Sequence, residues 1–363
     1  MPAYQVGIFS EREIKMELAM KCLPVGALPY DNIKHTTAMM SKLFSKMPFI
    51  ASLPNLSSGD TVTDWLFENT PGTIYKNGEL KLKIGDEKYE KGIAELDKAF
   101  NNPDSGELDK FCFHAEFFEK YLQMIKKFNS PNACVNLLGP FTISQMITST
   151  AKEQILADKS YRKLFIQSVC VKALWIIKQI KSVCSDTVPV IILEEPMLSQ
   201  FGMLKRKDED ITSDLIISLF AKVVEKIKST GAIVGVQCFE KCDWSLPIKA
   251  GVGLISFDAY NNPNNLSIIP ELITDYLRKG GMINWGIVPV VSDSMVKGLN
   301  NDYLYKRLCS TIDGTFLSGV PAELLYKNAL VSLNGNTDKL SVMFSEKANM
   351  LATHLGSRLA SRF

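Results

Sequence analysis

The sequence predicts an α/β fold, a single (β/α)₈ TIM barrel, and three observations support this prediction. From about residue 130, short continuous apolar runs alternate with amphipathic stretches, the pattern of buried parallel strands covered by helices. Six such runs lie between residues 133 and 333, and two more upstream bring the number to the eight that close a barrel. The chain of 363 residues is long enough for such a barrel with an insertion.

Each expected element follows from its local pattern. The eight apolar segments are 24–28, 49–53, 133–138, 188–193, 232–236, 254–257, 282–288 and 329–333. Apolar residues spaced by three and four predict helices at 32–46, 159–181, 210–229, 246–249, 268–278, 303–312 and 338–359. An open doubly wound sheet is the alternative, which is weakened because no Gly-x-Gly-x-x-Gly turn follows the first strand.

Residues 54–110 interrupt this rhythm. The stretch is polar and contains several glycines and a Lys-rich run at 79–83, which indicate a hairpin near 74–84. We expect one domain over residues 1–363, with 54–110 as an insertion that forms a lid over one barrel mouth, as long insertions often do.

Charge and cysteine content restrict the partners. Lys+Arg number 41 against 39 Asp+Glu, which predicts no nucleic acid and no anionic membrane as the default partner. Eight cysteines are too sparse for a disulfide scaffold. The first 20 residues carry charges where a signal peptide needs an apolar run, and no apolar window is long enough to span a bilayer. We therefore expect a cytoplasmic protein with reduced thiols.

The reactive face of a barrel lies at the carboxyl ends of its strands, which turns the strand list into a list of candidate residues. Glu194 and Glu195 directly follow an apolar strand, so one side chain can enter the mouth while the other packs sideways. Asp258 and Tyr260 follow another strand, and Asn334 follows the last. Carboxylates and amides gathered in this way suit a small polar molecule. Structural roles, as partners of neighbouring backbone groups or as loop caps, are the alternative.

Cys238 and Cys242 form a Cys-x₃-Cys pair at a further strand end. Two thiolates can begin a tetrahedral zinc site, to which Glu195 or Asp258 would add oxygen ligands. Ordinary packing of small buried residues is the alternative for both cysteines.

Several strand-end motifs resemble a known family as an ordered set. They are Val25-Gly-Ala-Leu-Pro29, Leu138-Gly-Pro-Phe-Thr142, Leu193-Glu-Glu-Pro196, Val236-Gln-Cys238, Ser256-Phe-Asp258 and Gly286-Ile-Val-Pro289. Together they resemble the catalytic domain of cobalamin-independent methionine synthase. That domain belongs to a (β/α)₈ superfamily shared with uroporphyrinogen decarboxylase and corrinoid-dependent methyltransferases.

The resemblance implies roles for individual residues. Gly26, Ala27 and Glu194 stand at the positions that hold the family's amino-acid substrate. Cys238 stands at the first zinc cysteine, and Asp258 approximates the acidic ligand. The family's histidine ligand is replaced by Val236 and its late cysteine by Asn334-Gly-Asn336, so the implied zinc site is degenerate unless Cys242 substitutes.

Three functions follow as hypotheses. The first is a methionine-synthase-like methyltransferase that acts on a small thiol or amino-acid-like substrate, with Glu195 and Asp258 as catalytic residues and a corrinoid protein or a second copy of the chain as partner. The second is a metal-free barrel that binds a small ligand or a cofactor, a folate or a corrinoid, without methyl transfer. The third is metal-independent proton or decarboxylation chemistry, which requires a carboxylate with a raised pKa.

Overall fold

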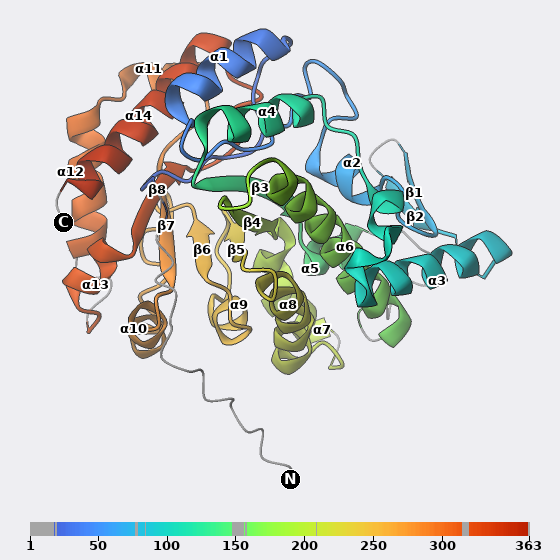
Figure 1. Ribbon diagram of the computed structural model, residues 1–363. Helices are drawn as coiled ribbons and strands as arrows, with labels where there is room; N and C mark the ends of the chain where they lie inside the picture. Colours follow the sequence, from blue (N-terminus) through green and yellow to red (C-terminus); the bar gives the residue numbers. More distant parts are fainter. Residues whose placement is uncertain are drawn as a thin grey trace.

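A parallel sheet of six strands forms the centre of the molecule (Figure 1). The structure is a computed structural model that describes residues 18, 20–76, 79–83, 85–146, 156, 158–207, 209–313 and 319–361. The strands are β3 (Asn132–Leu138), β4 (Val188–Glu194), β5 (Ile233–Cys238), β6 (Leu254–Phe257), β7 (Met282–Val288) and β8 (Ala329–Leu333). All neighbours are parallel and follow chain order, β3-β4-β5-β6-β7-β8.

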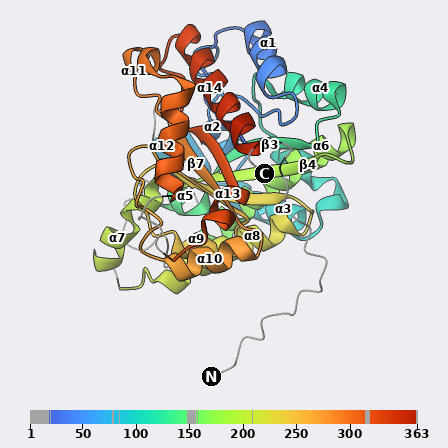
Figure 2. The same cartoon turned by 90° about the vertical axis from the view of Figure 1, so that its left-hand side faces the viewer.

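Helices surround this curled sheet in both views (Figures 1 and 2). They are α1 (Ile33–Leu43), α2 (Val62–Phe67), α3 (Glu87–Asn101), α4 (Phe118–Phe128), α5 (Pro140–Met146), α6 (Lys159–Val183), α7 (Phe201–Lys207), α8 (Ser213–Lys228), α9 (Ser245–Lys249), α10 (Pro270–Arg278), α11 (Asp293–Gly298), α12 (Asn301–Asp313), α13 (Ala322–Lys327) and α14 (Val342–Ala360). Short 3₁₀ helices are η1 (Pro103–Ser105), η2 (Glu107–Phe111) and η3 (Pro196–Gln200).

Polar side chains begin several of these helices where the sequence supplies a cap. Asn32, Asp158 and Thr212 precede α1, α6 and α8, and each side-chain oxygen accepts a backbone N–H of the first turn. Such a cap satisfies an N–H that has no partner within the helix. The six expected strands from 133 to 333 and the five helices expected between them agree closely with the structure, whereas the short helices α5, α7, α11 and α13 were not predicted.

The strand order decides between the two predicted α/β architectures. In a doubly wound sheet the order of the strands reverses at a switch point, whereas here each strand pairs with the next one along the chain. The structure thus has an α/β fold with a curled, singly wound parallel sheet.

The two upstream segments, 24–28 and 49–53, form isolated parallel bridges rather than strands. Cys22 bridges to Val331 of β8, Phe49 bridges to Cys134 of β3, and Ala27 bridges to Ser52. Pro24 begins the first segment, and Pro29, Pro48 and Pro54 adjoin the two segments. A proline has no N–H to give to a ladder, although Pro189 within β4 shows that one proline does not by itself end the pairing.

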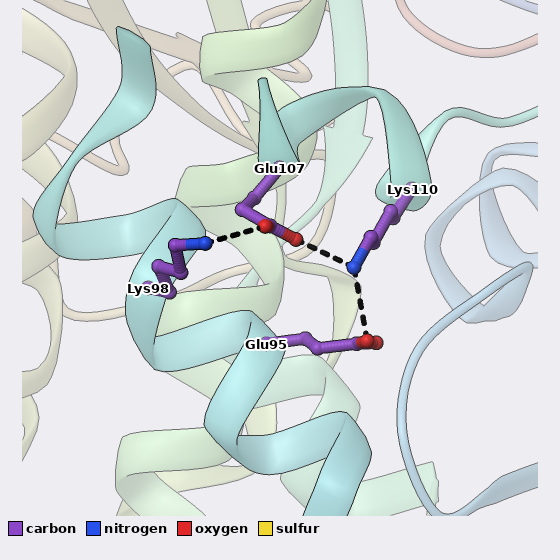
Figure 3. A network of polar contacts seen from close by, with 4 residues as sticks. All are labelled: Glu95, Lys98, Glu107 and Lys110. Atoms are coloured by element: carbon purple, nitrogen blue, oxygen red, sulfur yellow. Dashed lines mark hydrogen bonds and ion pairs between the residues drawn. The ribbon is translucent and has the colours of Figure 1, made fainter. Parts of the chain in front are cut away.

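The described residues between 54 and 117 form a layer that packs against α6 and, through α2, against β3. It contains α2, α3 and the antiparallel hairpin β1 (Thr73–Lys76) and β2 (Glu79–Leu82), which lies where the sequence predicts one. An ion-pair network ties α3 to η2 (Figure 3). Glu107 accepts from Lys98 and Lys110, both at 2.7 Å, and Lys110 also reaches Glu95 at 2.9 Å. The role of this layer as a lid stays a prediction.

Lys172 of α6 fastens that layer to the sheet domain. Its side chain is 1% exposed, and its Nζ donates to the backbone oxygens of Glu68 and, at 3.4 Å, Cys112. The Nζ also lies 5.9 Å from the centre of the Phe113 ring. Burial lowers the pKa of Lys172 from 10.5 to about 7.

Over the part of the chain that the structure describes, no helix combines the length and the apolar character that a bilayer crossing requires.

Candidate functional site

Ring contacts show which face of the sheet looks inward. Trp244, at the start of α9, packs on Phe257 of β6, and Phe257 packs on Trp285 of β7, with ring centres 6.3 and 5.3 Å apart. These aromatic residues therefore face the surrounding helices. Because side chains alternate along a strand, Ser256 and Asn284 face the concave interior.

The interior changes from apolar to polar toward the carboxyl ends of the strands. One registered row consists of Ile192, Gly235, Leu254 and Met282. Nearer the strand ends lies a set of polar side chains that we call the polar belt: Asn136, Glu194, Gln237, Ser256, Asn284 and Ser332, one residue from each of the six strands. Glu194, Gln237, Ser256 and Asn284 pair in one row, whereas Asn136 pairs with Ile192 one level below it and Ser332 pairs with Gly286 one level above it. A barrel interior is usually filled by branched apolar side chains, so a continuous polar level near the mouth indicates a binding site.

Hydrogen bonds connect the members of the polar belt. Asn136 Nδ2 donates to Glu194 Oε1 at 2.7 Å. Asn284 Nδ2 donates to the hydroxyls of Ser256 and Ser332 at 2.8 and 2.7 Å. Ser256 in turn donates to Gln237 Oε1 at 3.4 Å. The side chains hold one another in fixed orientations, as a preorganised site requires.

Glu194 is the acidic member of the belt. Its side chain is only partly buried, whereas Asn136 and Gln237 on either side are almost fully buried. A Cβ built on Gly26 would lie 3.5 Å from Asn136 Nδ2 and 3.7 Å from Glu194 Oε1, so Gly26 lies beside this pair. Burial raises the pKa of Glu194, and the hydrogen bond from Asn136 lowers it by a smaller amount.

Glu195 points away from the interior and anchors α5. Its oxygens accept from Phe141 N at 3.0 Å, Thr142 N at 2.7 Å and the Thr142 hydroxyl at 2.6 Å. Burial raises its pKa to about 7 against the opposing effect of these donors. A Cβ on Gly139 would overlap the Glu195 carboxylate, which gives the Gly139-Pro140 motif a structural reason. The catalytic role predicted for Glu195 stays a prediction.

Cys238 and Cys242 do come together at the end of β5. Burial raises the pKa of Cys242 well above its usual value, and contact with the Cys238 thiol adds to this shift. The Cys238 thiol also lies 3.6 Å from the backbone oxygen of Glu240. Within the described ranges, no group of three or more His, Cys, Asp or Glu side chains could hold a metal ion. Two thiols alone do not fit a tetrahedral zinc site, and we derive no step through zinc.

Asp258 and Tyr260 shape the loop after β6. Asp258 accepts from Asn261 N at 2.9 Å and from Asn261 Nδ2 at 2.6 Å, so both carboxylate oxygens are engaged by that loop. The Tyr260 hydroxyl lies 3.3 Å from that of Tyr303, and Arg307 stacks 5.0 Å from the Tyr260 ring centre. These bonds match the loop-cap arrangement weighed from sequence, and the catalytic role predicted for Asp258 stays a prediction.

Asn334 and Ala27 are held by backbone contacts between neighbouring loops. Asn334 Oδ1 accepts from Val290 N at 3.0 Å. Ala27 N donates to Asn336 Oδ1 at 3.3 Å. Of the residues singled out from sequence, the structure therefore brings Gly26 and Glu194 together in the belt. Their partner Asn136, like Ser256, Asn284 and Ser332, was missed; a polar residue inside an otherwise apolar strand was the available signal.

Larger hollows lie away from the strand ends. One of about 830 Å³ lies between α3, α6 and α8, and one of about 700 Å³ lies beside the β1–β2 hairpin. Lysines line both, and Lys163 and Lys83 are paired with Asp97 and Asp86 at 2.7 and 2.9 Å. In the first hollow, Asp97 accepts from Lys163 and Gln167, and these donors outweigh burial and lower its pKa. The pKa of Glu194 is raised instead, so we place the candidate site at the polar belt.

Comparisons with known proteins assign no family. No protein-family model matches the chain, and no curated protein matches it. Among solved structures, the chain is similar to a native Bacteroidetes-affiliated GH5 cellulase linked with a polysaccharide utilization locus, at 13% identity and a TM-score of 0.42, over 71% of this chain and 78% of that one. A second match is ZgEngAGH5_4 in complex with a cellotriose, at 10% identity and a TM-score of 0.39, over 88% of each chain.

These findings correct the family prediction. The resemblance to cobalamin-independent methionine synthase and the uroporphyrinogen decarboxylase superfamily was wrong, because no family model supports it and the two similar structures named above are GH5 proteins. The methyltransferase function, and the folate or corrinoid binding weighed beside it, are withdrawn with it. The physical reason is that short Gly-Pro and Glu-Pro motifs serve local geometry at strand ends, as Gly139 does beside Glu195.

Proposed function

We propose that the chain is an enzyme that transfers a proton to or from a small polar substrate at the polar belt, with Glu194 as the general acid or base and without a metal. The observation that supports this proposal best is the placement of Glu194. It is an oriented, partly exposed residue at the end of strand β4, with one carboxyl oxygen held by Asn136. Burial raises its pKa above the ordinary value, which is the direction that suits a carboxyl acting as a general acid or base.

Two-carboxylate chemistry is less well supported by the same geometry. Glycoside hydrolysis needs a pair of carboxyl groups that both face the substrate. Glu195 is engaged by the first turn of α5, and Asp258 is engaged by Asn261. The cellulase matches, at TM-scores below 0.5, add no support, so we do not extend their activity to this chain.

We also propose that residues 22–28 and 49–53 complete an eight-membered barrel around the belt. Leu23 N donates to Val331 O at 2.9 Å, Ser52 N to Gly26 O at 2.9 Å, and Cys134 N to Pro48 O at 2.8 Å. These bonds link β8 to the first segment, the first to the second, and the second to β3. They would also fix Gly26 beside Glu194. A cytoplasmic location and a homodimer stay predictions.

Solvent exchange tests the proposed proton transfer without knowledge of the substrate. A pool of small polar metabolites is incubated with the protein in D₂O, and mass spectrometry detects any compound that gains deuterium at carbon. Glu194→Gln should abolish the exchange because the amide carries no exchangeable carboxyl proton. Glu90→Gln, the same change at an exposed site on α3, should leave it intact. Equal exchange by wild type and Glu194→Gln would overturn the proposal, as would no exchange together with an ordinary Glu194 pKa.

A further inference from the structure

We propose that Asn284 determines the class of ligand that the polar belt accepts: a molecule that is not an anion and that donates an O–H or N–H to Asn284 Oδ1. This inference rests on the proposed function, since it concerns the same site. Asn284 is a residue that the sequence patterns did not indicate, and its amide oxygen defines the chemical class of the substrate.

The orientation of the Asn284 amide follows from its two neighbours. The Ser332 hydroxyl donates to the backbone oxygen of Leu333 at 2.7 Å, and the Ser256 hydroxyl donates to Gln237 Oε1. Each hydroxyl has one proton, so toward Asn284 both can only accept. The Nδ2 group therefore faces the two serines and uses both of its hydrogens. The amide oxygen must then point elsewhere.

That oxygen has no hydrogen-bond partner among the described residues, although the Asn284 side chain is fully buried. Buried polar atoms are nearly always satisfied, by protein, by ordered water or by a ligand. Asn284 lies on the concave face of β7, in the same polar level as Glu194. An unsatisfied acceptor in this place is suited to a donor group of the substrate.

The charge of the surrounding strands sets the second condition. Within the residues of β3 to β8 there is no Lys, Arg or His, and Glu194 is the single ionisable side chain other than cysteine. A carboxylate or phosphate in the belt would meet carboxyl and amide oxygens without a cation to balance it. An anion buried without a partner is strongly disfavoured.

Ligand-observed NMR with paired fragments tests this inference. Each pair matches a neutral donor with an anion of similar size, for example erythritol with erythronate and malonamide with malonate. We expect wild type to bind neutral members and not the anions. Asn284→Leu should weaken neutral binding at least about tenfold, since a buried acceptor is lost. Asn349→Leu is the matched control, because Asn349 is equally buried but lies on α14, where its amide bonds to Ser345.

The comparison of neutral and anionic fragments on wild type needs no variant, which protects the test if Asn284→Leu does not fold. Preferred binding of anions, no binding of neutral donors by wild type, or equal binding by wild type and Asn284→Leu would overturn the inference. A crystal structure with only an ordered water on Oδ1, unchanged when fragments bind, would also overturn it. The deuterium exchange lost in Glu194→Gln is a separate readout, so the proposed function can stand when this inference fails.

Discussion

Replacing Lys172 with methionine should flatten the dependence of stability on pH between pH 7 and pH 9. The native protein holds this lysine buried, with its pKa lowered by burial to about 7 against an ordinary value of 10.5. Between these two values the unfolded chain keeps the proton and the native chain loses it. The free energy of unfolding therefore rises with pH, and it is lowest below pH 7, where the charged group must be buried.

The size of the effect follows from the same two values. At 1.36 kcal/mol per pKa unit, burying the charged lysine costs roughly 5 kcal/mol at acidic pH, as an upper estimate. From pH 7 to pH 9, wild type should gain about 2 kcal/mol of stability that Lys172→Met does not gain. The substitution also removes the donor to the backbone oxygens of Glu68 and Cys112, a cost of about 1–3 kcal/mol that does not vary with pH.

Urea unfolding followed by tryptophan fluorescence at pH 7, 8 and 9 separates these contributions, because only the slope against pH reports the lysine. Lys178→Met is the control: this residue lies on the same helix with its side chain 46% exposed and paired with Asp109. Its slope should match wild type. If Lys172→Met and wild type show parallel slopes, the lysine is not buried in the way the structure describes.

Two further outcomes are expected. Gly139→Ala should lower the free energy of unfolding by about 3 kcal/mol in urea titrations, because the new Cβ displaces the Glu195 carboxylate from its donors on α5. Gly202→Ala is the control and should have almost no effect, because a Cβ there meets nothing within 4 Å. Equal losses of stability in the two variants would contradict this reasoning. Protein purified without chelator should contain well below one zinc per chain, because two thiols do not complete a tetrahedral site; one zinc per chain that disappears in Cys238→Ala would show that a third and fourth ligand are recruited.

Much of the fold follows from local pattern. The segments 254–257 and 282–288 were predicted with the same limits as β6 and β7, because continuous apolar runs between turn residues allow few other structures. The segments 24–28 and 49–53 were apolar too, yet they form only isolated bridges. Hydrophobicity indicates where the chain is buried but does not determine how far a strand ladder extends.

The site was less predictable because it depends on direction. Adjacent Glu194 and Glu195 look equivalent in sequence, and the structure separates them: one faces Asn136 in the interior and the other faces the first turn of α5. Asn284 lies within an apolar strand, where a sequence offers no measure of whether its neighbours satisfy both ends of the amide. The family resemblance failed for a related reason: its motifs lie at the strand ends and include few of the residues that line the interior of the sheet.

The polar belt has one residue on each of six strands, and this distribution has a consequence for how such a pocket changes over time. Loops can be lengthened, shortened or exchanged with little effect on the belt, because none of its members lies on a loop. Altered access and altered ligand chemistry should therefore evolve separately, the first through the loops and the second through single substitutions on the strands. Side chains that their neighbours already hold in place lose little conformational entropy on binding, so the ligand preference of the polar belt is preorganised in the unbound protein.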